Sequence, residues 1–202
     1  FSPTNYRQIE LLASVADSQT KAYMINGLMR GWTPEKAERA IGIIVGNSTP
    51  TQQREILSAL DLKRLGNEME NPDRAAEVLN VISKAGFDPT LMDKHMTSFF
   101  EGVTSQFNIF NPFNQKDDDT ADAFIRKLDK KAIEMLPDNI KLQFFKALDG
   151  GPTSATEYLR MRELAAGCSP TLKAEMINYL MAQNTNGDQE TLIMNMILDT
   201  SA

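Results

Sequence analysis

The feature that most constrains the fold of this chain is an internal repeat at a spacing of 120 residues, without a gap. Residues 23–60 laid on residues 143–180 carry identical turn, cap and core residues, and most apolar positions between them also agree. Such self-similarity is typical of a supersecondary unit that is used twice. The identical pairs are Leu28/Leu148, Gly31/Gly151, Thr33/Thr153, Pro50/Pro170, Thr51/Thr171, Glu55/Glu175 and Leu60/Leu180.

The apolar residues recur at helical spacing almost throughout, as in the first face of Ile9, Leu12, Val15 and Ala16. Cap residues followed by proline, as in Thr49-Pro50, indicate helix starts. The chain is therefore predicted to be all-α, with two bundles of short helices related by the repeat. We expect a first repeat with an N-terminal helix over residues 1–86, a connecting segment of helices and loop over 87–136, and a second, shortened repeat over 137–202.

The connecting segment contains an unusual stretch. Residues 88–103 have a helical pattern, and residues 104–116 then interleave Phe107, Phe110 and Phe113 with asparagines. We expect an extended loop here whose phenylalanines fold back onto the helices. The alternative is an exposed aromatic patch that contacts a partner or a membrane. The aspartates before Thr120 are expected to cap a helix over residues 121–135.

The acidic composition of the chain narrows the classes of function that we expect. The net charge of −6 and the pI near 4.9 argue against a nucleic-acid binder. The chain begins with Phe1 instead of methionine, so a processed or excised segment is expected, and an upstream domain of the same chain is one expected partner. The compartment stays open, with an exported or surface-associated protein among the alternatives.

The residues suggest no reactive centre. The single histidine, His95, lies on an apolar helical face, and the single cysteine, Cys168, precedes a helix start, so both are expected to be packing residues. One cysteine and one histidine cannot complete a zinc site, and no phosphate-binding loop or nucleophile motif is present. We expect no enzymatic activity and no cofactor, with calcium as the one exception considered.

The segment from Ile25 to Ser83 resembles a single annexin repeat. It has a helix ending in Met-Arg-Gly, a turn at Gly31–Thr33 followed by an acidic residue, an apolar helix ending in Asn-Ser, and further short helices. Residues 140–198 resemble the same repeat more weakly. Annexins carry four such repeats, and this chain has two.

The resemblance implies a calcium site that bridges to phospholipid. Carried over residue by residue, its loop would be Arg30, Gly31, Trp32 and Thr33, and its distal carboxylate Glu68 or Glu70. The second copy would use Gly150, Gly151 and Thr153, with Asp188 or Glu190 as the acid. The loop departs from the family pattern because it lacks the second glycine of Gly-x-Gly-Thr, and calcium needs converging oxygens at about 2.3–2.6 Å.

Two functions follow as expectations. The first is a non-enzymatic helical scaffold that binds a protein partner. The alternative is calcium-dependent binding to an anionic membrane surface, in which Trp32 would be an interfacial anchor. If Trp32 is not such an anchor, we expect it to pack between helices. Contact with a partner or membrane would involve Trp32, Phe107, Phe110 and Phe113.

Overall fold

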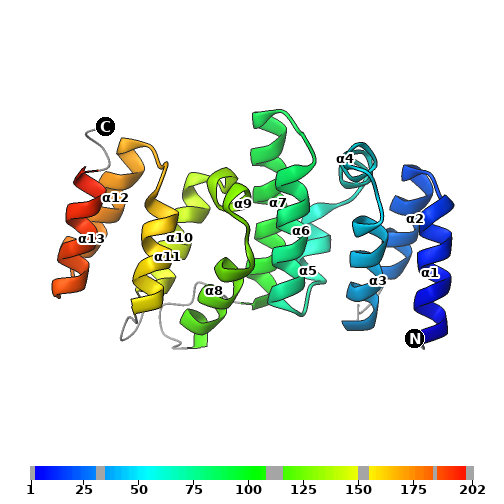
Figure 1. Cartoon of the computed structure of the whole chain (residues 1–202), viewed down its shortest axis with the longest axis horizontal. Helices are drawn as coiled ribbons and strands as arrows, with labels where there is room; N and C mark the ends of the chain where they lie inside the picture. Colours follow the sequence, from blue (N-terminus) through cyan, green and yellow to red (C-terminus); the bar gives the residue numbers. More distant parts are fainter. Residues whose placement is uncertain (1–2, 31–34, 108–115, 150–154, 184–185, 199–202) are drawn as a thin grey trace. The chain divides into compact units, whose positions relative to one another are not determined.

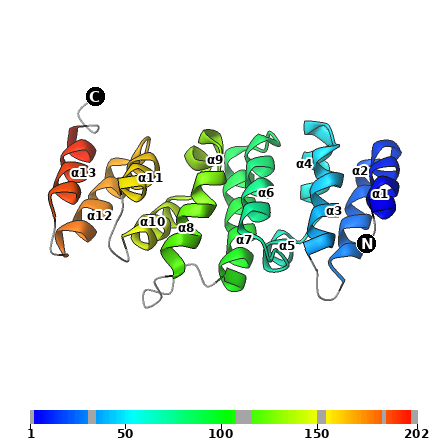
Figure 2. The same ribbon diagram turned by 60° about the horizontal axis from the view of Figure 1, so that its bottom comes forward.

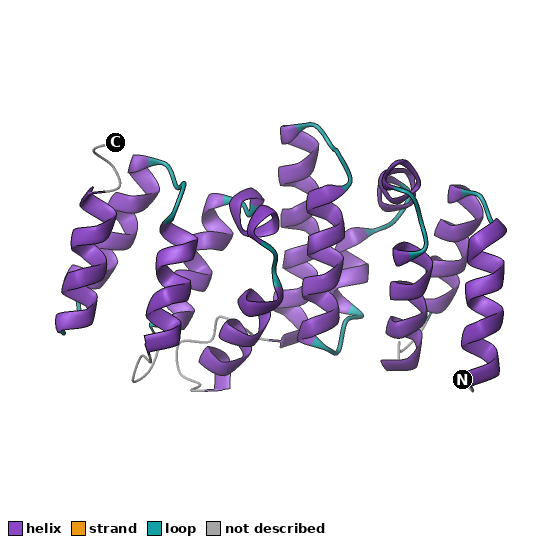
Figure 3. Cartoon of the chain, in the orientation of Figure 1, coloured by secondary structure: helices purple, strands orange, loops and turns teal. Residues whose placement is uncertain are grey.

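The computed structural model describes residues 3–30, 35–107, 116–149, 155–183 and 186–198. These residues form thirteen α-helices and no strand, which confirms the all-α prediction (Figures 1 and 3). No helix in these ranges combines the length and apolar character that crossing a bilayer requires.

The chain divides into two compact units. Unit 1 comprises Phe1–Phe107 and Lys127–Met135, and unit 2 comprises Asn108–Arg126 and Leu136–Ala202. Unit 1 contains α1 (Pro3–Val15), α2 (Ser18–Leu28), α3 (Glu35–Gly46), α4 (Pro50–Ser58), α5 (Leu62–Asn67), α6 (Pro72–Lys84), α7 (Pro89–Phe107) and α9 (Lys130–Met135). Unit 2 contains α8 (Lys116–Lys127) up to Arg126, α10 (Asp138–Leu148), α11 (Ala155–Ala165), α12 (Pro170–Met181) and α13 (Gly187–Leu198).

Local side-chain chemistry starts the helices where the sequence predicts. At α4 the Thr49 hydroxyl accepts from the backbone N–H of Gln52, and the Gln52 side chain accepts from the N–H of Thr49. This reciprocal pair satisfies two backbone donors that the first turn would leave free. Asn71 caps α6 by accepting from the N–H of Asp73, and Ser169 caps α12 by accepting from the N–H of Leu172; each is followed by a proline that cannot donate.

Helix starts in the two units match at fixed spacings. The starts of α2 and α10, of α3 and α11, and of α4 and α12 each differ by 120, while α6 and α13 start 115 residues apart. The difference arises because α5 has no counterpart between α12 and α13. The equal spacing between the first residues of these helices agrees with a repeated unit. The arrangement of the chain as two equivalent bundles stays a prediction.

In unit 1, α5 and α7 cross in close contact, and α6 packs against α3, α4, α7 and α9. Figures 1 and 2 show α6 and α7 side by side. Glycine makes the α5–α7 crossing close: a Cβ at Gly66 would overlap the carbonyl oxygen of Phe99, and one at Gly102 would overlap that of Lys63.

In unit 2, aromatic residues fill the core. The Phe124 ring of α8 stacks on Phe144 of α10 with centroids 5.5 Å apart, and Phe145 meets the edge of Tyr179 at 6.5 Å. Phe124, Phe144 and Phe145 are fully buried. Aromatic side chains of this size account for much of the apolar area that a small bundle can bury.

The structure corrects three expectations about the connecting segment. Residues 104–107 are helical, because α7 continues to Phe107. Residues 117–120 lie inside α8, which begins at Lys116, so they are not a cap before it. The helix expected over 121–135 is divided at Leu128–Asp129 into α8 and α9.

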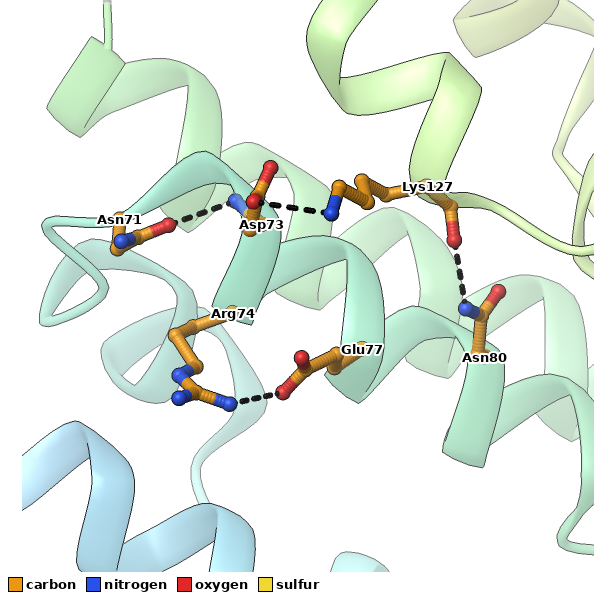
Figure 4. A network of polar contacts seen from close by, with 6 residues as sticks. All are labelled: Asn71, Asp73, Arg74, Glu77, Asn80 and Lys127. Atoms are coloured by element: carbon orange, nitrogen blue, oxygen red, sulfur yellow. Dashed lines mark hydrogen bonds and ion pairs between the residues drawn. The ribbon is translucent and has the colours of Figure 1, made fainter.

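The division has a clear physical cause. The Asp129 carboxylate accepts from the N–H of Ala132 at 2.9 Å, which starts a new helix, and the N–H of Asp129 donates to the Asn80 side chain at 2.9 Å. Asn80 also donates to the carbonyl oxygen of Lys127 at 2.9 Å (Figure 4). An amide on α6 thus supplies the backbone partners that a continuous helix would otherwise provide.

Candidate functional site

The calcium site implied by the resemblance falls partly outside the described residues. Gly31, Trp32 and Thr33 lie there, as do Gly150, Gly151 and Thr153. Arg30 is exposed, and its backbone N–H donates to the carbonyl oxygen of Gly27 at 3.3 Å.

The predicted distal carboxylates belong to the turn between α5 and α6. Glu68 caps the C-terminus of α5, and both Glu68 and Glu70 are half-buried. In unit 2, Asp188 and Glu190 are exposed in the first turn of α13. Within the part of the chain that the structure describes, no three histidine, cysteine or acidic side chains are grouped as a metal ion requires.

The structure reveals an acidic residue at this turn that our sequence reasoning missed. Glu38 of α3 is only 2% exposed, and its carboxylate accepts from the backbone N–H of Glu70. Burial raises the pKa of Glu38, against the lowering effect of that hydrogen bond. The sequence signal was the position of Glu38 within the apolar face of Ala37, Ile41 and Ile44. Glu38 fixes the turn into α6, which is a structural role.

The equivalent position in unit 2 makes an equivalent contact. Tyr158, 120 residues after Glu38, hydrogen-bonds through its hydroxyl to the Asn186 side chain at 3.1 Å. Asn186 in turn accepts from the N–H groups of Asp188 and Gln189 at the start of α13. The residue at this position therefore contacts the start of α6 in one unit and the start of α13 in the other.

The three phenylalanines predicted to contact a partner are not placed. Phe107 is the last residue of α7, but its side chain lies outside the described part of the structure, as do Phe110 and Phe113. Their contact with a partner or membrane stays a prediction.

Cys168 is buried and free. Its thiol donates to the carbonyl oxygen of Leu164 at 2.9 Å, and burial raises its pKa, which disfavours the reactive thiolate. Ser48, at the matched position in unit 1, donates likewise to Ile44 at 2.8 Å. Both side chains close the turn that follows a helix.

His95 is half-buried on α7, with its ring centroid 4.5 Å from that of Phe87, and its Nε2 atom is buried without a partner. Burial lowers its pKa, the nearby Lys94 lowers it further, and Asp88 partly offsets both. A lowered histidine pKa means that the unfolded chain binds the proton more readily than the folded chain does.

We therefore expect the free energy of unfolding to be highest above the unfolded histidine pKa of about 6.5 and to fall as the pH drops through the lower folded value. Since His95 is the only histidine, a His95→Leu variant should have a flatter profile between neutral pH and the carboxylate range. Urea unfolding at several pH values checks this. Parallel profiles for the parent and the variant would contradict it.

The most distinctive surface lies on the first and last helices. On α1, Leu11, Leu12 and Val15 are 62%, 58% and 82% exposed, and we name them the α1 face. On α13, Met194, Ile197 and Leu198 are 56%, 47% and 60% exposed, and we name them the α13 face.

The α1 face corrects the sequence interpretation, which grouped Leu12 and Val15 with Ile9 as one apolar face. In the structure the side of α1 that meets α3 carries Tyr6 and Ala13: Ala13 is fully buried, and the Tyr6 hydroxyl donates to the carbonyl oxygen of Lys36 at 3.0 Å. Arg39 of α3 also lies over the Tyr6 ring, 4.8 Å from its centroid. Leu12 and Val15 therefore remain in solvent.

In comparisons with known proteins, no protein-family profile, curated protein or solved structure matches this chain.

Proposed function

We propose that this chain is a non-enzymatic helical scaffold that binds a protein partner through the α1 face and the α13 face. The observation that carries the proposal is the exposure of three large apolar side chains on each of these two helices. Adjacent exposed apolar residues on one helix face are typical of interaction sites.

Site-specific photo-crosslinking in the organism that makes the protein tests this proposal. A photoreactive residue at position 12 or 197 should capture a protein, whereas one at position 23 should not. Tyr23 is a matched control because it is 71% exposed but lies on α2 and belongs to neither face. Absence of any protein adduct at positions 12 and 197 would refute the proposal. Capture of a further segment of the same polypeptide would support an intramolecular partner.

Thermal unfolding and vesicle co-sedimentation of the same protein distinguish this proposal from the alternative, calcium-dependent phospholipid binding. We expect calcium to leave the unfolding temperature unchanged and vesicles of anionic phospholipid to leave the protein in solution. An ion that binds only the folded chain must raise its apparent stability. A calcium-dependent rise together with co-sedimentation would favour the alternative, with Arg30, Glu68 and Glu70 as the first residues to substitute.

A further inference from the structure

Two asparagine–glycine pairs occur in the sequence, Asn26-Gly27 and Asn186-Gly187. Such a pair is prone to spontaneous deamidation, because glycine has no side chain to shield the backbone nitrogen that attacks the asparagine amide. The structure places the two pairs in different settings. Asn26 and Gly27 lie inside α2, whereas Asn186 is exposed and directly precedes α13, which begins at Gly187.

The helical setting of the first pair blocks the reaction. For the Gly27 nitrogen to reach the side-chain carbonyl carbon of Asn26, the backbone between the two residues must rotate out of helical geometry. Inside α2 this rotation would break bonds that span the pair, such as that from the N–H of Met29 to the carbonyl oxygen of Ile25 at 3.0 Å. An interruption inside a helix costs several backbone bonds at once. Asn26 is therefore protected as long as α2 is folded.

The second pair lies at a helix end, where local opening costs least. The Asn186 Oδ1 atom accepts from the N–H groups of Asp188 at 3.1 Å and Gln189 at 3.0 Å, and from the Tyr158 hydroxyl at 3.1 Å. The Gly187 nitrogen is in the first helical turn, whose backbone donors have no partner within the helix. Rotation of Asn186 therefore releases the cap bonds while the later turns of α13 keep theirs.

We propose that Asn186 is a spontaneous modification site, at which opening of the α13 cap lets the asparagine convert to aspartate and isoaspartate. The Gly187 nitrogen gives up its proton and bonds to the side-chain carbonyl carbon of Asn186, and the side-chain amide nitrogen leaves with that proton as ammonia. Water then opens the resulting succinimide ring. Attack of water at the former side-chain carbonyl gives aspartate, and attack at the main-chain carbonyl gives isoaspartate.

The two products have different effects on the start of α13. Aspartate keeps an acceptor oxygen at the cap and adds a negative charge at the helix N-terminus, where the macrodipole favours it. Isoaspartate lengthens the main chain by one carbon atom, so its carboxylate no longer meets the N–H groups of Asp188 and Gln189 in the geometry of the cap. Formation of isoaspartate should therefore loosen the first turn of α13 and its contact with Tyr158 of α11.

Peptide mapping by mass spectrometry tests the proposal on the full chain, kept folded at mildly alkaline pH. Conversion should accumulate at Asn186 while Asn26 remains an amide. In urea both sites should convert at similar rates, because the fold no longer distinguishes them. Gly187→Ala should slow conversion at Asn186 severalfold by placing a methyl group beside the attacking nitrogen. The fold tolerates this variant, since a Cβ at Gly187 meets nothing within 4 Å.

Tyr158→Phe separates the effect of the cap from that of the sequence motif. Loss of the hydroxyl removes one hydrogen bond to the Asn186 oxygen, so conversion in the folded chain should become about two- to tenfold faster, with no change in urea. In aged protein, hydrogen exchange at Asp188 and Gln189 should rise with the isoaspartate content. Equal conversion at Asn26 and Asn186 in the folded chain would overturn the site. An unchanged folded rate in Tyr158→Phe would overturn its dependence on the cap.

Discussion

Substitution of Gly66 by alanine is expected to destabilise unit 1 by about 3 kcal/mol or more. A Cβ at this position would overlap the carbonyl oxygen of Phe99 and lie 2.9 Å from the backbone nitrogen of Val103. Both atoms belong to the backbone of α7, so no rotamer change relieves the clash. Gly102→Ala should have a similar effect, since its Cβ would lie 2.6 Å from the nitrogen of Asn67.

Urea unfolding followed by circular dichroism measures the loss, and hydrogen exchange locates it in α5 and α7. Gly42→Ala is a matched control, because Gly42 is inside α3 and a Cβ there meets nothing within 4 Å. It should stabilise the protein by about 0.5–1 kcal/mol, since alanine restricts the unfolded chain and favours helix. If Gly66→Ala behaved like Gly42→Ala, the close crossing of α5 and α7 would be wrong.

Phe144→Ala is expected to cost about 3–5 kcal/mol in unit 2, the range for removing a buried aromatic side chain. Phe144 is fully buried and stacks on Phe124, so its removal leaves a cavity between α8 and α10 and ends the ring contact. Chemical unfolding with hydrogen exchange on α8, α10 and α12 measures the effect.

Leu159→Ala in the same unit provides the comparison. Leu159 is 50% exposed on α11, so we expect a change below about 1 kcal/mol. Equal losses for the two variants would show that Phe144 contributes no more than a surface residue, and would contradict the packing of α8 on α10.

The sequence predicts the elements that depend on local chemistry. Thr49-Pro50 and Asn71-Pro72 locate the starts of α4 and α6 because the capping side chains act within three residues. The break between α8 and α9 could not be predicted in this way. It depends on the Asn80 side chain, 49 residues away from Asp129, and the only local signal is Asp129 itself, whose capping of Ala132 becomes recognisable in the fold.

The candidate site was harder to predict, for a related reason. Helical periodicity identifies apolar positions but not which of them another element covers. Leu79 and Met194 occupy matched positions, yet only Leu79 is buried; α6 packs against α3, α4, α7 and α9, whereas α13 packs mainly against α11 and α12. The acidic residues of the predicted calcium set were recognisable as charged, but only the fold places Glu38 against the N–H of Glu70.

The absence of an α5 counterpart between α12 and α13 has a consequence for how helices can pack in unit 2. In unit 1 the long helix α7 reaches α6 beside α5, whose Gly66 admits the α7 backbone. Only residues 182–186 link α12 to α13, too few for a six-residue helix such as α5. The short link therefore leaves out the close, glycine-based crossing that packs the backbone of a long helix against α5 in unit 1.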